Sequence, residues 1–476
     1  MSTLRTTQSR YREVGRINSA LVSRPQSAAT SVPLEERRVL RLVSLSLSAY
    51  ILLGPVVTLM QVADVFTEGG WHVRLHALCF GLPLVLAALS ATLVTTTTIR
   101  FPGSTCLDAI AVAMGTYWIL QTVHGYVNQN EMHYLISTSF NFQIPTLVYF
   151  SLRKLSHPLV LSELRRSLDK TCILSVPLTV VAALYALRVG YIGAGTPLHL
   201  LPLSAGLVAL SRDHSLLATY ILFMASATII ASMKRAVWGG MLMLLFVFAI
   251  LCPQIIGRLR SVVVCTTASA CVFILIHGYL PESLKADVLV GRAFSVITET
   301  NGFEHGQARQ DEYEGILSAV FDERSDWKAL FGLGMGATYT YHSLRTHNEI
   351  STNHHDSHFT PTAWLLRGGY LGVAINSAFY LIACYSCIVA CRLAVTPDKR
   401  AWNAAYAAYF VVAISQSAAA FSLTPNPATH IALMAIILCP VRTIAAPQLP
   451  RLGPGRQPSP VSLTAETLAT RAQRAI

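Results

Sequence analysis

Residues 353–372 read NHHDSHFTPTAWLLRGGYLG, a cluster of histidines around one aspartate that leads directly into an apolar run containing glycines. This stretch marks the junction between a long polar connection and the apolar segments that make up most of the chain. Hydrophobic residues account for 53% of the 476 residues and charged residues for 13%, whereas an average soluble domain is about 25% charged. Together with a mean hydropathy of +0.49, this composition predicts a polytopic membrane protein.

Apolar runs of about 20 residues recur along the chain, and each is long enough to cross a hydrocarbon core of about 30 Å as a helix. Helices satisfy their own backbone hydrogen bonds in lipid, so we expect an all-α fold with about twelve transmembrane helices. The predicted spans are residues 39–62, 75–98, 107–125, 134–152, 171–190, 193–211, 214–233, 235–256, 261–280, 360–391, 402–423 and 428–444.

Charge predicts on which side of the membrane each connection lies. Residues 1–38 carry seven arginines and no apolar run, which indicates a cytoplasmic tail rather than a cleaved signal peptide. Positive-inside topology explains these arginines, so no nucleic-acid partner is expected. The connection at 153–170 is also basic. The segment at 193–211 is short and contains two prolines, but counting it as a span places the later basic connections and the tail at 445–476 in the cytoplasm as well.

The predicted topology gives nine helices within residues 39–280, three within residues 360–444, and one large loop between them at 281–359, on the outer, periplasmic face. The loop contains twelve acidic residues but six Lys and Arg, which fits a translocated segment. None of the ten cysteines lies in it, so we expect no disulfide framework there. A helical patch is expected at 313–321, and a glycine-rich turn at 331–336, FGLGMG.

Acidic residues fall in predicted tails and loops, apart from Asp108 at a helix edge. Ion-coupled transporters usually place carboxylates or broken polar helices within the membrane, and none of the twelve predicted spans supplies such a relay. The chain also contains no Walker motif for binding ATP. A coupled transporter is therefore disfavoured, whereas an uncoupled flippase with a cationic cavity stays open.

Arg235, in the stretch SMKRAVWGG, opens a predicted helix beside Trp238. Snorkelling and an aromatic belt at the membrane interface explain such a cation. The alternative is a phosphate clamp, because the guanidinium fork binds phosphate oxygens bidentately. The outer-face arginines available for such a clamp are Arg188, Arg235, Arg292 and Arg309. Arg367, near the start of the span at 360–391, either snorkels outward or provides a further phosphate contact.

The histidines at 354, 355 and 358 allow three interpretations. A zinc site is one, since His and Asp are good ligands, but no matched downstream ligand set follows. A purely structural role at the interface is the second. The third is a general base, which needs a histidine whose pKa lies near the working pH and a group that fixes its tautomer. His358 lies nearest the following helix, and Asp356 or His355 is placed to orient it.

These features resemble the O-antigen ligase and Wzy-type polymerase superfamily. In that family the long periplasmic loop ends in a histidine, followed eleven residues later by Gly and three residues after that by another small residue. His358, Gly369 and Gly372 have this spacing. SMKRAVWGG is similar to the family's helix-opening SRGAW stretch. WKALFGLGMGATY, at 327–339, is similar to its glycine-containing loop segment, and Arg309 lies where such loops often carry a pyrophosphate-binding arginine.

The resemblance covers residues 188–390 and implies a multi-pass glycosyltransferase of the bacterial inner membrane with a periplasmic active face. It implies transfer of a glycan from an undecaprenyl-pyrophosphate donor to a sugar hydroxyl on a glycan or lipid acceptor, without a metal or other cofactor. Membrane lipids and a chain-length regulator or flippase are the partners it suggests. The implied site residues are His358, His355 and Asp356 for catalysis, and Arg235, Arg309, Arg292 and Arg188 for pyrophosphate binding.

One position departs from the family. Phe359 follows the key histidine where Asn, Ser or Gln is usual, which leaves open whether His358 or His355 is the base. It also favours a polymerase of exopolysaccharide or O-antigen over a ligase that joins polymer to lipid A core. A lipid-linked glycan transporter without catalysis is the alternative from a different class. Small residues at Gly369 and Gly372 predict that the helix packs closely against a neighbour.

Overall fold

The computed structural model describes residues 106–153, 158–188, 199–212, 214–231, 235–276, 302–321, 326–343, 349–354, 360–394, 396–419 and 427–438, with parts of a helical segment within 37–56. Most of these residues are helical, and the described part of the chain is all-α apart from one hairpin. The predicted span at 75–98 and the tail at 445–476 lie outside the described residues.

Among the described elements, the first eight are α4 (Cys106–Val127), α5 (Met132–Arg153), α6 (Pro158–Arg188), α7 (Leu200–Ser211), α8 (Ser215–Ala231), α9 (Arg235–Leu251), the 3-10 helix η2 (Pro253–Arg258) and α10 (Leu259–Ile276). The later ones are α12 (Gly302–Val320), α13 (Asp326–Phe331), β1 (Tyr339–Ser343), β2 (Glu349–His354), α14 (Thr360–Arg392), α15 (Pro397–Ala419) and α16 (Pro427–Leu438). β1 and β2 pair antiparallel.

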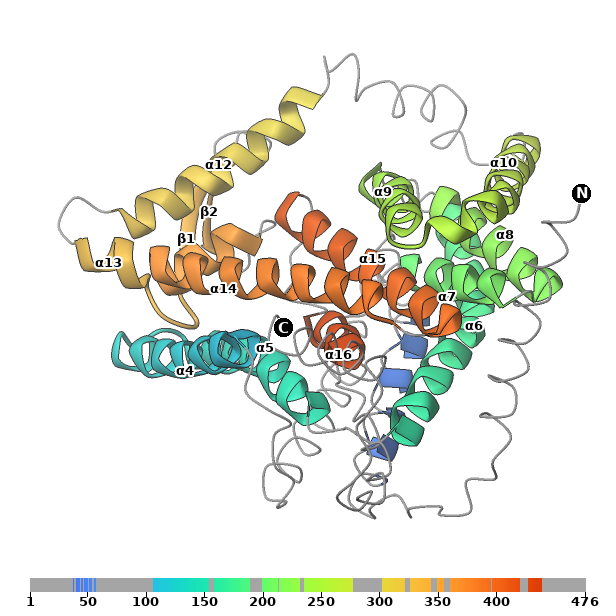
Figure 1. The fold of residues 1–476 in the computed structure, drawn as a ribbon. Coiled ribbons are helices and arrows are strands. Elements are labelled where there is room, and N and C mark those ends of the chain that lie inside the picture. Colours follow the sequence, from blue (N-terminus) through green and yellow to red (C-terminus); the bar gives the residue numbers. More distant parts are fainter. Residues whose placement is uncertain are drawn as a thin grey trace, which may run out of the picture.

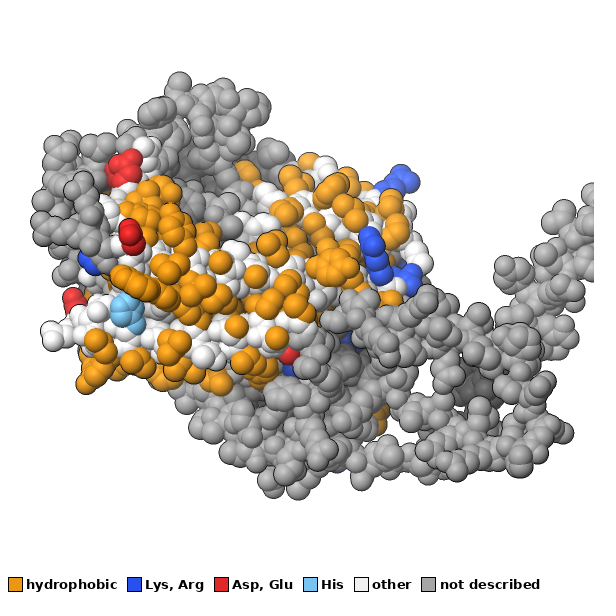
Figure 2. Space-filling view, turned by 60° about the vertical axis from the view of Figure 1, so that its left-hand side comes forward, with side chains coloured by type: hydrophobic (Ala, Val, Ile, Leu, Met, Phe, Trp, Pro, Cys, Tyr) orange, Lys and Arg blue, Asp and Glu red, His pale blue; other side chains and the backbone are white. Residues whose placement is uncertain are grey.

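Three of the described helices are long and apolar enough to cross a membrane: α4, the Leu159–Tyr185 part of α6, and α14. α7, α8 and α9 are apolar but shorter. Large hydrophobic side chains also remain exposed, among them Leu381 on α14 at 70%. Figure 2 shows one such face, with hydrophobic side chains across its middle, Lys and Arg mainly at one end and most Asp and Glu at the other. The composition of the surface and the lengths of the helices identify a membrane-associated protein.

α6 begins 13 residues earlier than the span predicted at 171–190, so most of the connection predicted at 153–170 is helix. Pro158 stands at the first helical position, where its missing N–H costs nothing. Leu161, Leu164 and Leu168 follow at helical spacing and are all buried, which explains why the segment folds as helix despite its charges.

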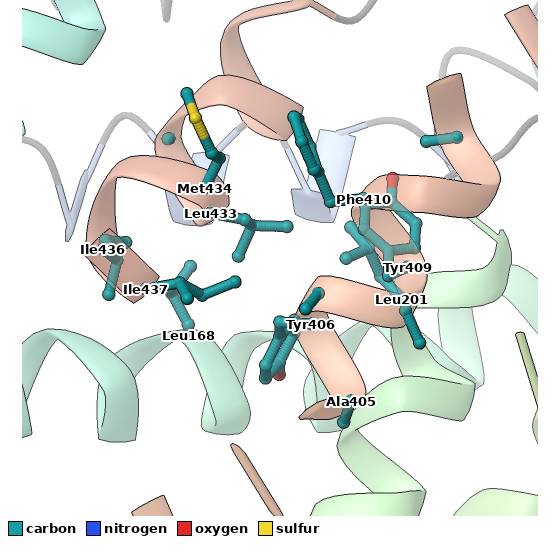
Figure 3. Packing of buried hydrophobic residues seen from close by; sticks show 14 of the residues in the cluster. Leu168, Leu201, Ala405, Tyr406, Tyr409, Phe410, Leu433, Met434, Ile436 and Ile437 are labelled. Atoms are coloured by element: carbon teal, nitrogen blue, oxygen red, sulfur yellow. The ribbon is translucent and has the colours of Figure 1, made fainter. Parts of the chain in front are cut away.

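The centre of the bundle is α15, whose residues from Ala401 to Phe410 are all buried. Figure 3 shows Tyr406, Tyr409 and Phe410 of this helix facing side chains of α16, such as Leu433, with Leu168 of α6 close by. Figure 1 shows α12, α13 and the hairpin at one side of the molecule and α6, α7, α8 and α10 at the other, with α14 reaching from the first group toward the second.

Charged side chains join several helix ends. Arg153, at the end of α5, donates from Nε and Nη2 to the two carboxylate oxygens of Asp108, at the start of α4, both at 3.1 Å. Arg212, after α7, pairs with Asp169 of α6 and Asp398 of α15. The predicted topology assigns these ends to one side of the membrane. Asp169 belongs to α6 and is 7% exposed, which corrects the expectation that it lies in a loop.

The loop segment contains more structure than its sequence predicts. The helical patch expected at 313–321 is confirmed as part of the longer α12. The turn expected at 331–336 is also confirmed, with three glycines at positive φ. The β1–β2 hairpin and α13 were not predicted. α12 packs on β1 and on α14, and α13 packs on α14, so the described part of the loop rests on the helices rather than standing apart from them.

Candidate functional site

α14 breaks at Gly369, which has φ 57° and ψ −161°. The rings of Trp364 and Tyr380 stack with centroids 5.6 Å apart and planes 9° apart. Sixteen residues of straight helix would separate them by about 24 Å, so residues 360–368 fold back along the following part of the helix. The span predicted at 360–391 matches the bounds of α14, but the helix is not continuous across Gly369. A glycine is needed at the break because an L-residue with a side chain is strained at this φ and ψ.

The break leaves backbone carbonyls of α14 without their helical donors, and other parts of the chain supply new ones. Leu366 O accepts from Leu333 N at 2.9 Å, and Arg367 O accepts from Gly334 N at 3.1 Å. Gly368 O accepts from the hydroxyl of Tyr117 on α4 at 2.6 Å. The glycine-rich turn at 331–336, hereafter the glycine segment, thus takes the place of the missing helical turn.

The glycine segment also binds the junction between α4 and α5. Met335 N donates to Gln121 O of α4 at 3.0 Å. Gly336 N donates to the Thr138 hydroxyl of α5, also at 3.0 Å. Asn130 Nδ2, between the two helices, donates to Met335 O at 2.8 Å. The segment therefore fixes α14 to α4 and α5 mainly through backbone groups.

Close approach explains why the segment is rich in glycine. A Cβ on Gly334 would lie 2.5 Å from the backbone nitrogen of Gly125, and the residue has φ +84°. A Cβ on Gly369 would lie 2.4 Å from a backbone carbonyl carbon of Leu330. Both positions exclude any other residue without movement of the backbone, because neither contact is with the end of a flexible side chain.

A small, half-open cleft lies between α4, α5 and α14. Four of its ten lining residues are aromatic, and three others carry an amide or a hydroxyl. The residues that line it are Met114, Trp118, Asn141, Phe142, Pro145, Thr360, Ala363, Trp364, Asn376 and Tyr380. Pro145 lies inside α5 and has no N–H, so the carbonyl of Asn141, four residues earlier, lacks its helical donor.

Arg367 lies behind one wall of this cleft. It is 0% exposed, and its Cζ lies 5.3 Å from the centroid of the Phe142 ring. Of the two interpretations of Arg367, outward snorkelling is therefore wrong. A cation over an aromatic face is stabilised by the ring quadrupole, the more so when both are shielded from water.

Glu312 of α12 and Tyr339 of β1 form a second buried polar pair, in which the Tyr339 hydroxyl donates to Glu312 Oε1 at 3.1 Å. Burial, followed by the negative charge of Glu312, raises the pKa of the Tyr339 hydroxyl far above its ordinary value, while the charge of Arg367 acts in the opposite direction. Tyr339 therefore stays protonated and holds α12 against β1.

The structure describes only some of the predicted site residues, and those lie on different helices. His355, Asp356, His358 and Arg292 lie outside the described residues. Arg309 belongs to α12, which packs on α14, whereas Arg235 begins α9, which packs on α15. Arg188 is the last residue of α6. Thr360, which lines the cleft, follows His358 by two residues in the sequence.

The cleft residues were not predicted, although one signal was available. Pro145 four residues after Asn141 indicates a carbonyl without its helical donor on an apolar helix. The side chains of Trp118, Asn376 and Tyr380 carry no such signal, because only the fold-back of α14 brings them together. Among the described residues, no group of three or more His, Cys, Asp and Glu is placed to hold a metal ion.

The fold and the cleft define an all-α, membrane-associated protein whose polar loop docks into a broken helix. No protein-family model matches the chain. No curated protein matches it in sequence either.

Proposed function

We propose that the protein is a membrane glycosyltransferase that polymerises glycan at the periplasmic face, using an undecaprenyl-pyrophosphate-linked donor. The observation that carries the proposal is the contact between the glycine segment and the break of α14. These are two of the sequence stretches that resemble the polymerase and ligase superfamily, and they lie more than 30 residues apart in the chain. Their hydrogen bonds support a shared role in shaping one site next to Thr360.

The proposed reaction is an inverting displacement at the anomeric carbon of the donor sugar. The acceptor hydroxyl oxygen forms a bond to that carbon while the bond to the pyrophosphate oxygen breaks. The hydroxyl proton passes to His358, with His355 as the alternative base and Asp356 to orient it. The pyrophosphate leaves with the bonding electron pair, and Arg235 and Arg309, with Arg292 and Arg188 as further candidates, stabilise its charge.

His358→Ala tests the base. General acid–base catalysis contributes about 10²–10⁴-fold, so we expect long-chain product to fall at least about 100-fold while the protein still inserts into the membrane. The measurement is elongation of lipid-linked repeat units by the purified protein in detergent. His133→Ala is the matched control, because its side chain is 66% exposed at the start of α5 and has no proposed role. Normal polymer length with His358→Ala would overturn the base assignment.

Arg235→Ala tests the pyrophosphate clamp in the same assay. We expect loss of long-chain product with normal insertion, because the leaving group would lack a fixed counter-charge. Unchanged elongation would remove Arg235 from the site and leave the aromatic-belt interpretation.

Transport of a lipid-linked glycan without chemistry is a second candidate, and the break in α14 favours it. Discontinuous helices with half-helix ends inside the bundle are typical of transporter binding sites. The elongation assay separates the candidates. Longer product supports a polymerase, and transfer only to an added lipid A core supports a ligase. Movement of the lipid-linked unit across vesicles with no product supports a transporter.

A further inference from the structure

α13 carries apolar side chains that stay at the surface of the described structure. None of its six residues is buried, and Trp327 is 70% exposed. The backbone of α13 lies on the break of α14, because a Cβ on Gly369 would meet the carbonyl carbon of Leu330 at 2.4 Å. α13 thus meets α14 through its backbone, while the side chains of Trp327 and Leu330 remain outside. Tyr370, the residue after Gly369, lies beside α13 for the same reason.

Further aromatic rings extend this surface from α13 to α12 and α14. The rings of Trp327 and Phe331 stack, with centroids 5.5 Å apart and planes 15° apart. Phe321, directly after α12, contacts Tyr370 of α14, with ring centroids also 5.5 Å apart. Tyr370 is 56% exposed. The residues Phe321, Trp327, Leu330, Phe331 and Tyr370 are hereafter called the aromatic patch.

The aromatic patch is continuous with a lipid-facing stripe of α14. Tyr370, Ala374, Leu381 and Tyr385 are all exposed, and their spacing places them on one face of the helix. α14 is long and apolar enough to cross a membrane, so lipid is what covers this stripe. Tyr370 is the end of the stripe that touches the patch, and the patch therefore begins where the lipid-covered face of α14 ends.

The composition of the aromatic patch suits a membrane interface. Trp and Tyr are enriched there, because their rings are apolar while their N–H and O–H groups reach water. Trp327 and Tyr370 are the two most exposed members of the patch. Asp326 and Lys328, on α13, carry opposite charges that cancel. Apolar contact, and not attraction to anionic lipid, is therefore what this surface offers to a membrane.

α12 marks where the patch ends. One and two turns before Phe321, its exposed face carries Ser318 and Glu314. Gln310, one turn further, donates to Glu314 at 2.8 Å on the same exposed face. In Figure 2 the hydrophobic side chains extend up to the end of the molecule where most Asp and Glu lie. A polar surface follows the aromatic one, as expected where a helix leaves the membrane interface for water.

We propose that the aromatic patch lies in the headgroup region of the membrane, in the leaflet on the loop side, with phospholipid as its partner. α13 then rests on the membrane surface, and α12 leads away from it into water. The backbone contact between α13 and Gly369 holds the patch level with the end of the lipid-facing stripe of α14. This seating does not depend on the proposed glycosyl transfer.

Fluorine NMR tests the depth of Trp327. The protein is labelled with fluorotryptophan in phosphatidylcholine nanodiscs, and Trp327→Phe identifies the resonance of Trp327. Three paramagnetic groups are added separately: a lipid spin label just below the headgroup, a lipid spin label at the end of the acyl chain, and a water-soluble gadolinium chelate. We expect the label below the headgroup to broaden the Trp327 resonance at least about twofold more than either of the others, because interfacial rings lie at that level.

Leu381→Trp, made in the Trp327→Phe background, is the reference for the hydrocarbon core. Leu381 lies on the same stripe as Tyr370 and about 16 Å further along α14, so the label at the end of the acyl chain should broaden its resonance most. Replacing part of the phosphatidylcholine by phosphatidylglycerol should leave the broadening of Trp327 unchanged, because the charges of α13 cancel. A strong dependence on phosphatidylglycerol would contradict apolar seating.

Three other results overturn the proposal. Broadening of Trp327 mainly by gadolinium shows that the patch faces water, where a glycan has access to its rings. Broadening mainly by the label at the end of the acyl chain shows that the patch is buried in hydrocarbon and not at the interface. Protection from all three groups shows that protein covers the patch, and native mass spectrometry of the discs then counts the copies of the chain.

Leu330→Asp and Ser318→Asp test the boundary of the patch. Both add one negative charge at an exposed position, but only Leu330 belongs to the patch. Leu330→Asp should lower the lipid broadening of Trp327 at least about twofold and raise the gadolinium broadening, because a carboxylate is costly among lipid chains. Ser318→Asp should change neither, and equal responses of the two variants would overturn the proposal. Thermal unfolding shows whether each variant is folded, and if Leu330→Asp does not fold, the broadening of wild-type Trp327 decides.

Discussion

The two ends of the α4–α5 pair are held by different chemistry. At one end Arg153 binds Asp108 through two charge-assisted hydrogen bonds, and Tyr149 donates to the same carboxylate at 2.6 Å. At the other end the glycine segment binds both helices and α14 largely through backbone groups. We call these the charged end and the glycine end.

The difference shows what each end demands of the sequence. The charged end needs particular side chains at helix termini. Two or three residues are enough to form its contacts. The glycine end needs side chains to be absent, because backbone meets backbone at Gly334 and Gly369. The glycine end also brings segments of the loop against the bundle. The proposed site and the cleft lie at this junction. Three substitutions, from the largest expected effect to the smallest, test this contrast.

Asp108→Ala should have the largest effect. It leaves Arg153 buried without its carboxylate, and breaking a buried ion pair costs about 3–5 kcal/mol. Thermal unfolding in detergent should show a large fall in Tm. Asp108→Asn is the matched variant, since it keeps an acceptor for Tyr149 but removes the charge, and it should fall between Ala and wild type. An unchanged Tm in Asp108→Ala would show that the charged end does not stabilise the bundle.

Gly334→Ala should come next. Its Cβ would meet the backbone of Gly125 at 2.5 Å, and strain at positive φ costs about 1–3 kcal/mol before the clash is counted. We expect lower Tm and faster proteolysis within the loop, because the glycine segment would no longer dock. Gly239→Ala on α9 is the control, as a Cβ there meets nothing within 4 Å, and it should be neutral or slightly stabilising. Equal stability of the two variants would contradict the backbone contact.

The helices and the glycine end also differ in how well the sequence predicts them. α4, α5, α8 and α10 were predicted to within a few residues, because each is an apolar run bounded by polar residues. The start of α6 was missed because Arg165 and Asp169 resemble loop residues. Their burial depends on Arg212, Trp402 and the end of α16, which are far away in the sequence.

At the glycine end, FGLGMG predicts a turn because its glycines permit positive φ. The break of α14 was missed because Gly369 and Gly372 fit a continuous helix that packs closely on a neighbour. What ends the helix is the supply of donors from Leu333, Gly334 and Tyr117, and that depends on tertiary structure. The cleft follows from the break, so its residues could not be predicted before the break was known.

Asp398→Asn should have the smallest effect, and it compares the buried ion pair of the charged end with a more exposed pair elsewhere in the bundle. Asp398 pairs with Arg212, but its side chain is 58% exposed and that of Arg212 is 35% exposed. Exposed pairs contribute about 0–1 kcal/mol and are screened by salt. Tm should fall slightly at low salt and match wild type at high salt. The buried Asp108 pair should show little salt dependence, so a salt response of equal size in both variants would show that water reaches both pairs and that the charged end is not sealed.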